Sequence, residues 1–297
     1  MAAIKESKGD RIFNGICLVI ATIIMLLVLY PLIYILSCSI SDGSYVANGD
    51  IWLLPKGINF RGYARVFQDP NIMTGYGNTI FYTVFGTLLN LAMTLTAGYA
   101  LSKKTLPGRK YFMFFIIFTM YFSGGIIPMY LQVKNFNLLD TRLVLIIMGA
   151  VSVYNLIVAR TFFQSIPGEL EEAATIDGCT TYRLFWSIIL PLSKALISVM
   201  VLYYGVAHWN SYFNALIYIS DDVKKPLQIF LRRILILEQL STEMADSQNA
   251  ERMYEAEQLK LLLKYSVIVV SSLPVLIIYP FMQKYFDKGV LLGSLKG

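Results

Sequence analysis

Few side chains in this sequence have the types and spacing that covalent chemistry requires. His208 is the only histidine among the 297 residues. The sequence has no H-E-x-x-H motif, no paired carboxylates within an apolar segment and no phosphate-cradling G-x-x-x-x-G-K-[ST] stretch. Cys17, Cys38 and Cys179 lack the spacing of a disulfide or a metal site. We therefore expect no catalytic site, metal or cofactor in this chain, and any energy that it uses must come from another protein.

A polar and acidic stretch interrupts the apolar sequence at residues 171–191, EEAATIDGCTTYRLFWSIILP. Ser165 can cap a short helix that begins at Pro167. The acidic residues near its start, which favour the positive end of the helix dipole, are Glu169, Glu171 and Glu172. Gly178 suits the end of this helix, and Thr180 suits the start of a second one. The sequence thus predicts a short acidic helix, a glycine elbow and a segment that leads into an apolar helix.

This segment has the properties of a docking element that is joined directly to an apolar helix. Ala173 and Ala174 give the short helix a smooth side for close contact with another protein, and its carboxylates suit a basic partner. The alternative is an ordinary loop helix that packs on its own chain.

The composition indicates which elements surround this segment. Hydrophobic residues make up 56% of the chain and charged residues only 15%, whereas soluble domains have about a quarter charged residues. About 20 apolar residues cross a bilayer as a helix, because the backbone must be satisfied within the segment. We predict an all-α membrane protein with spans at 14–37, 77–101, 111–131, 142–162, 185–206 and 262–283. The apolar core of the first span is too long for a signal peptide, so we interpret it as a retained helix.

Basic residues in the short loops predict the orientation. The link between spans two and three carries Lys103, Lys104, Arg109 and Lys110. The link between spans three and four has only Lys134 before the edge of the next span. The positive-inside rule therefore places the first link in the cytoplasm. With six spans, both termini and the loop at 163–184 are then cytoplasmic as well.

The spans themselves contain almost no ionisable groups. Lys194, close to the cytoplasmic end of span five, is the only charged residue more than two positions inside the ends of any span. Ion-coupled carriers usually hold such groups within the membrane. This counts against a self-powered pump, although a secondary carrier remains an alternative. A membrane scaffold or regulatory subunit that binds an ATPase without forming a path is another.

The polar interruption matches a known pattern at every fixed position. The run from Glu172 through Gly178 to Pro191 resembles the E-A-A-x3-G-x9-I-x-L-P loop of ABC importer permeases. Other blocks are similar, in the same order, to the carbohydrate-type, MalG-like permeases of the LplC/YtcP group. They include FSGGIIPMYLQVKNFNLLDT, RTFFQSIPGELEEAATIDG and WNSYFNALIYISDDVKKPLQIFLRRIL. The resemblance extends over nearly the whole chain.

The resemblance implies an architecture and a set of partners. Spans two to six would form a type I importer (MetI-like) permease core at 77–290, with the coupling loop at 163–184 and a long outer loop at 207–261. Residues 1–76 would contribute a peripheral helix, and 291–297 a cytoplasmic tail. The chain would be a bacterial cytoplasmic-membrane subunit that imports oligosaccharides, including uronate-containing ones, and would not itself be an enzyme. Its partners would be a second homologous permease, two ATPase subunits that bind ATP and Mg²⁺, and an extracytoplasmic solute-binding protein.

The resemblance also implies roles for residues at the cytoplasmic side. In that family a coupling helix sits in a cleft of the ATPase, so Glu172 would pair with a basic residue there. The other residues of this motif are Ala173, Ala174, Gly178, Leu190 and Pro191. A tail that matches 289–297 enters the ATPase dimer interface in MalG-like permeases, although its composition alone is typical of a frayed end. This tail carries Gly289, Gly293 and Lys296.

Polar and aromatic residues on the spans are candidates for the sugar path, because sugars stack on ring faces and hydrogen-bond through their hydroxyls. They are Asn78, Asn90, Tyr154, Asn155, Tyr203, Tyr204, His208, Trp209, Asn210 and Asn214. Each could instead make an interhelical hydrogen bond or an interfacial anchor. The partner permease could also hold the main sugar site. The outer segments 41–75 and 211–261, with an amphipathic stretch at 226–240, could receive the binding protein or form solvated loops.

Overall fold

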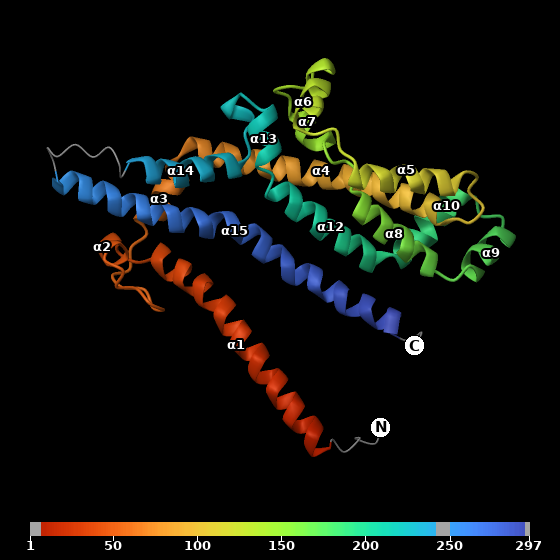
Figure 1. Ribbon diagram of the computed structural model, residues 1–297, viewed down its shortest axis with the longest axis horizontal. Coiled ribbons are helices and arrows are strands. Elements are labelled where there is room, and N and C mark those ends of the chain that lie inside the picture. Colours follow the sequence, from red (N-terminus) through yellow and green to blue (C-terminus); the bar gives the residue numbers. More distant parts are fainter. Residues whose placement is uncertain (1–6, 242–249, 295–297) are drawn as a thin grey trace. The chain divides into compact units, whose positions relative to one another are not determined.

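The computed structural model describes residues 7–241 and 250–294, and these residues form helices and loops without a strand (Figure 1). Contacts divide the chain into two compact units, Met1–Asp69 with Arg233–Ser272 and Pro70–Arg232 with Leu273–Gly297. The elements up to the middle of the chain are α1 (Lys8–Ser39), α2 (Gly43–Ala47), α3 (Arg61–Gln68), α4 (Pro70–Ser102), α5 (Arg109–Tyr121), α6 (Ile126–Asn135), α7 (Arg142–Ile147) and α8 (Val153–Ser165). Those that follow are α9 (Glu169–Ile176), α10 (Thr181–Leu184), η1 (Phe185–Ile189), α11 (Leu190–Leu192), α12 (Lys194–Trp209), α13 (Phe213–Tyr218), η2 (Asp222–Lys224), α14 (Leu227–Ser241) and α15 (Ala250–Ser294).

The first unit is built on α1. A reciprocal pair of hydrogen bonds between Ser7 and Asp10 caps its start. Its 32 residues are about 48 Å long at 1.5 Å per residue, which exceeds the roughly 30 Å of bilayer hydrocarbon. Its apolar side chains are exposed along most of its length, and only its end packs, around Cys38 and Leu262. The predicted first span lies within this helix.

The predicted spans differ in how continuous they are. Among the described residues, α1, α4 and the stretch Glu257–Pro280 of α15 are long and apolar enough to cross a membrane alone, and counting each bent pair as one span gives up to five. The predicted span at 111–131 is such a pair, because α5 and α6 meet at 114°. The span at 142–162 was expected to be one helix, but residues 148–152 divide it into α7 and α8.

Helix α4 is the centre of the second unit, and α7, α8 and α12 pack against it (Figure 1). Its buried residues recur every three or four positions and are mostly small or polar. They include Gly75, Thr79, Gly86, Asn90, Thr94 and Gly98. Small residues let membrane helices approach closely, and hydroxyl and amide groups link them. At Gly86 a Cβ would lie 2.4 Å from the His208 ring, so only glycine admits α12 at this distance.

Candidate functional site

The predicted coupling helix is α9, and its start differs from the prediction. The predicted cap at Ser165 is wrong: Ser165 is the last residue of α8, and its hydroxyl donates to the Phe162 carbonyl of that same helix. Helix α9 instead follows Gly168 without a side-chain cap. The acidic first turn is as predicted, with Glu169, Glu171 and Glu172. The N–H groups of Leu170, Glu171 and Glu172 donate to the carbonyls of Pro167 and Gly168. The acidic side chains therefore contribute through the positive end of the helix dipole and not as caps.

The predicted glycine elbow is confirmed. The Cys179 N–H donates to the Ala174 carbonyl over 2.9 Å, and the Gly178 N–H donates to the Thr175 carbonyl over 3.0 Å. This pair of bonds is the Schellman motif, which requires a left-handed residue between them. Gly178 has φ +74°. The next helix, α10, starts as predicted at Thr180, whose side chain accepts from the Arg183 N–H.

One side of α9 packs against its own chain. Ala174 is buried in a core cluster with Tyr99, Phe163 and Phe185. Glu171 forms an ion pair with Lys103, and the Lys103 ammonium also lies 4.1 Å from the centre of the Tyr99 ring. The prediction that Ala174 lies on an outward docking side is therefore wrong. This inward side fixes α9 to the ends of α4 and α8.

Helices α9 and α10 and the π-helix η1 also carry exposed side chains, and several of these are apolar. Glu172 and Ala173 are exposed, and Ile176 is 86% exposed. Tyr182 and Trp186 follow on α10 and η1 with exposures of 75% and 52%. Exposed apolar and aromatic side chains on neighbouring elements are typical of a protein interface. We define these five residues as the coupling face.

The coupling face is joined to α12 through a sharp bend. Pro191 has no N–H for the helical ladder, and the preceding residues Phe185–Ile189 form a π-helix. Ser193 ends this segment with its hydroxyl bonded to the Ile189 carbonyl over 2.7 Å. The segment Thr181–Leu192 then meets Lys194–Trp209 at 80°. The coupling face is therefore connected to α12 through a bend at Ser193.

A polar cluster links α4, α12 and the break between α7 and α8. The Asn90 amide donates to the carbonyls of Gly149 and Ala150 over 2.7 and 2.8 Å. Its carbonyl oxygen lies 2.7 Å from His208 Nε2, so Nε2 carries the proton in this arrangement. Asn90 is completely buried. Non-helical backbone at membrane depth needs such partners, and Asn90 supplies them to the break.

Tyr204 supports the same break one turn away. Its hydroxyl accepts from the Ser152 N–H over 3.3 Å and lies 2.7 Å from Thr94 Oγ1. Tyr204 and Thr94 are buried. Four of the path candidates thus make interhelical or helix-to-loop hydrogen bonds. They are Asn78, Asn90, Tyr204 and His208.

The other path candidates are divided between buried and exposed positions. Asn155 is buried, and Trp209 packs edge-on against Tyr76. Asn210 ends α12, where its amide donates to the Val206 carbonyl over 2.9 Å. Tyr154 and Tyr203 are 56% and 47% exposed, and neither hydroxyl has a hydrogen-bond partner in the described part of the chain. Of the tail residues, Gly289 and Gly293 lie within α15, and Lys296 is outside the described residues.

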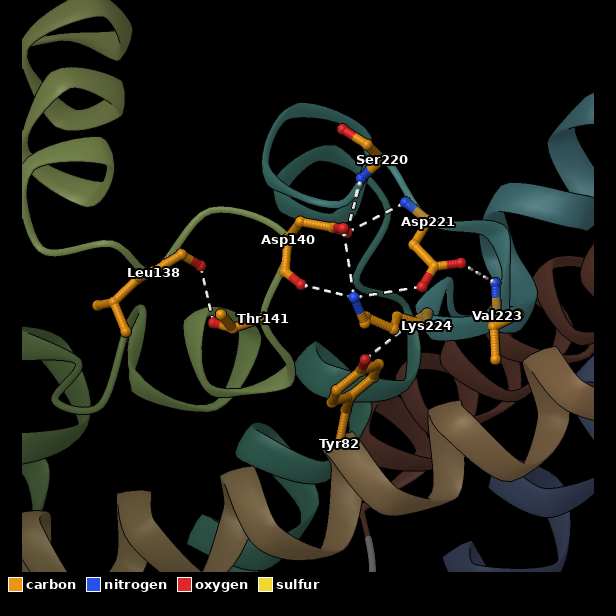
Figure 2. Close-up of polar contacts among 8 residues, drawn as sticks. All are labelled: Tyr82, Leu138, Asp140, Thr141, Ser220, Asp221, Val223 and Lys224. Atoms are coloured by element: carbon orange, nitrogen blue, oxygen red, sulfur yellow. Dashed lines mark hydrogen bonds and ion pairs between the residues drawn. The ribbon is translucent and has the colours of Figure 1, made fainter.

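A second polar network joins the loop before α7 to the loop that contains η2 (Figure 2). Asp140 Oδ1 accepts from the N–H groups of Ser220 and Asp221 over 3.2 and 3.0 Å. The Lys224 ammonium donates to the Asp140 carbonyl and contacts the carboxylates of Asp140 and Asp221. The Tyr82 hydroxyl donates to the Lys224 carbonyl over 2.7 Å. The network thereby ties both loops to α4.

The network should make stability depend on pH. The hydrogen bond from the Asp221 N–H, together with Lys224, lowers the pKa of Asp140. A lowered folded-state pKa stabilises the protein above the unfolded value of about 3.9, and this contribution is lost as the pH falls through the folded pKa. Asp140 has φ +54°, which Asn tolerates. Asp140→Asn should therefore keep the backbone, lower Tm at pH 7 and reduce the fall in Tm between pH 5 and 3.

Thermal unfolding of the purified protein across this pH range measures the effect. Asp50→Asn, at an exposed position of the first unit, is the matched control and should retain the wild-type fall. If Tm of Asp140→Asn falls as much as that of the wild type, this carboxylate does not contribute to the pH dependence of stability.

Comparison with known proteins places this geometry in context. Residues 94–292 match the family described as "Binding-protein-dependent transport system inner membrane component". Protein LplC of Bacillus subtilis is 40% identical over 98% of this chain and 97% of its own length. The polygalacturonan/rhamnogalacturonan transport system permease protein YtcP of the same organism is 37% identical over 99% and 100%. A crystal structure of a bacterial ABC transporter involved in the import of the acidic polysaccharide alginate contains a similar chain. The TM-score is 0.84 at 37% identity, over 96% of this chain and 100% of that one.

Proposed function

We propose that this chain, which belongs to the family of binding-protein-dependent transport system inner membrane components, is one of two homologous permeases that form the path of a bacterial oligosaccharide importer. The coupling face carries this proposal, because it combines an exposed carboxylate with exposed apolar side chains next to the bend at Ser193. A cleft of an ATPase subunit, with a basic residue for Glu172, is the partner that this surface fits. ATP hydrolysis in two such subunits would then move α12 through the 80° bend.

The same proposal orients the chain. Lys103 lies in the basic loop that the positive-inside rule assigns to the cytoplasm, and its ion pair with Glu171 holds α9 at that end. The coupling face is then cytoplasmic, as are both termini. The network of Asp140 and Lys224 then lies on the outer side, where a solute-binding protein delivers the sugar. The C-terminal residues from Gly289 onward would add a second contact with the ATPase dimer.

The substrate is proposed to be an oligosaccharide that contains uronic acids. Support comes from the relatives, since the names of two refer to polygalacturonan/rhamnogalacturonan and alginate. Tyr154 and Tyr203 are the best candidates for sugar contact in this chain. Both present an exposed ring and a hydroxyl without a partner in the described residues, and an unpaired hydroxyl is costly against lipid. In a path between two permeases, a bound sugar would stack on these rings and accept hydrogen bonds from their hydroxyls.

Uptake by the assembled transporter tests the proposal. Cells that express this chain with its partner permease, ATPase and binding protein should accumulate labelled oligogalacturonate or oligoalginate only when ATP is hydrolysed. The double change Tyr154→Ala and Tyr203→Ala should lower uptake about tenfold, as expected for the loss of roughly 1.4 kcal/mol of binding. Expression in the membrane should not change.

Tyr30→Ala is the matched control, because Tyr30 is also 47% exposed but lies on α1. Uptake that follows a proton or sodium gradient without ATP would instead identify a secondary carrier. ATPase binding without any uptake would identify a scaffold.

A further inference from the structure

A basic cavity of about 690 Å³ lies among the loop after α4, the start of α5 and the side of α8. Its charged lining consists of Lys104, Arg109, Lys110 and Arg160. No acidic residue is among the described residues that line it, and none of the four cations forms an ion pair within the described part of the chain. The cavity is therefore a concentrated positive site without an internal counterion.

Arg160 is the group in the cavity that is best placed to bind an anion. Its Nε is buried and has no hydrogen-bond partner among the described residues. Arg109 is close enough to interact electrostatically with it, and two like charges repel. Buried cations are normally paired. A ligand with oxygen acceptors and negative charge would satisfy both guanidinium groups, which match phosphate geometry well.

The remaining wall of the cavity is apolar and follows α5 away from the charged end. It contains Met113, Phe114 and Ile117, and Phe114 is 63% exposed. Met113 also packs with Leu101 and Leu156, which closes the floor between α4, α5 and α8. A small soluble anion would leave this wall uncovered. A ligand with a charged end and a hydrocarbon chain would use both parts of the cavity.

We propose that this cavity binds an anionic glycerophospholipid. Arg109 and Arg160 hold the phosphate, Lys104 and Lys110 contact its outer oxygens, and an acyl chain lies along Phe114 and Ile117. The position agrees with the membrane edge, because the basic loop ends α4 and begins α5. Basic pockets between membrane helices at the cytoplasmic side are known to suit such headgroups. The site depends on membrane embedding and not on the identity of the sugar.

Lipid titration of the assembled transporter tests this site. The detergent-purified, delipidated complex is titrated with dioleoyl-phosphatidylglycerol or dioleoyl-phosphatidylcholine, and bound lipid is counted by native mass spectrometry. The wild type should retain phosphatidylglycerol selectively. Lys104→Gln with Lys110→Gln, at two exposed positions, should weaken this binding about tenfold or more without unfolding the protein, since a lost charge-assisted hydrogen bond typically costs such a factor. Arg160→Gln should have a larger effect.

Lys134→Gln, which removes an exposed charge at the end of α6, is the matched control and should bind lipid like the wild type. Equal retention of both lipids by the wild type would overturn the proposal, as would equal binding by all variants. Glycerol phosphate that displaces the lipid at similar concentrations would overturn the lipid assignment, because it lacks the acyl chain.

Discussion

Glu172→Lys is expected to reduce ATP-driven uptake about 30-fold or more and to weaken retention of the ATPase. Glu172 is exposed on the coupling face, so inside this chain its charge contributes little. Against a basic cleft the same carboxylate loses its water and becomes an interfacial pair. Loss of one partner from such a pair costs about 2–5 kcal/mol, and 2 kcal/mol corresponds to roughly 30-fold. Uptake and copurification of the ATPase from the same membranes measure both effects.

Glu169→Lys is the matched control for this change. Glu169 is also exposed and lies in the same first turn, so both variants lose a similar helix-dipole contribution of about 0.3–1 kcal/mol. Only Glu172 belongs to the E-A-A pattern of this sequence. Equal uptake by the two variants would show that Glu172 has no specific partner.

Gly178→Ala tests the contribution of the glycine elbow without changing the charge of Glu172. A Cβ at Gly178 would meet no atom within 4 Å, so the change acts only through the left-handed backbone, at about 1–2 kcal/mol. We expect impaired uptake with the ATPase still bound, because Glu172 is unchanged. Wild-type uptake would show that the elbow geometry is not needed for coupling.

Local signals in the sequence predicted most of the coupling segment. The acidic turn, Gly178 and Thr180 each act on their own backbone, so residue type alone indicates the structure. Ser165 failed as a cap because a serine can also bond back to its own helix, which it does here. The side on which Ala174 lies could not be predicted, because packing against Tyr99 and Phe163 determines it.

Contacts between distant residues were beyond prediction from one sequence. Lys103 was noticed only for orientation, yet it holds α9 through Glu171, 68 positions later. Asp140 and Lys224, 84 positions apart, were not singled out as a pair. The break at 148–152 had a weak signal in Gly149, which an average of hydropathy over 20 residues conceals. The bend after Pro191 had a clear signal in that proline, but its angle depends on the packing of α12.

Asn90→Leu is expected to cause the largest loss of stability, about 2–5 kcal/mol. The amide of Asn90 satisfies the Gly149 and Ala150 carbonyls, and its oxygen accepts from His208. Leucine would leave three polar groups without this partner, in contacts that are only partly buried. An unsatisfied group that is fully buried costs about 1–3 kcal/mol. The loop between α7 and α8 can partly relax, so the total loss of stability stays below the sum of the three separate costs. Thermal unfolding of the purified protein and its yield in the membrane measure the loss.

Thr96→Ala distinguishes this role from a general effect of polar residues on α4. Thr96 is exposed on the same helix, and its hydroxyl bonds only to the carbonyls of its own turn, those of Ala92 and Met93. We expect its Tm to stay close to that of the wild type. If Asn90→Leu were as stable as Thr96→Ala but lost uptake, Asn90 would act in the sugar path, as the alternative interpretation of the sequence holds. If it is destabilised, the hydrogen bonds of Asn90 serve to hold the non-helical break between α7 and α8 against the bundle.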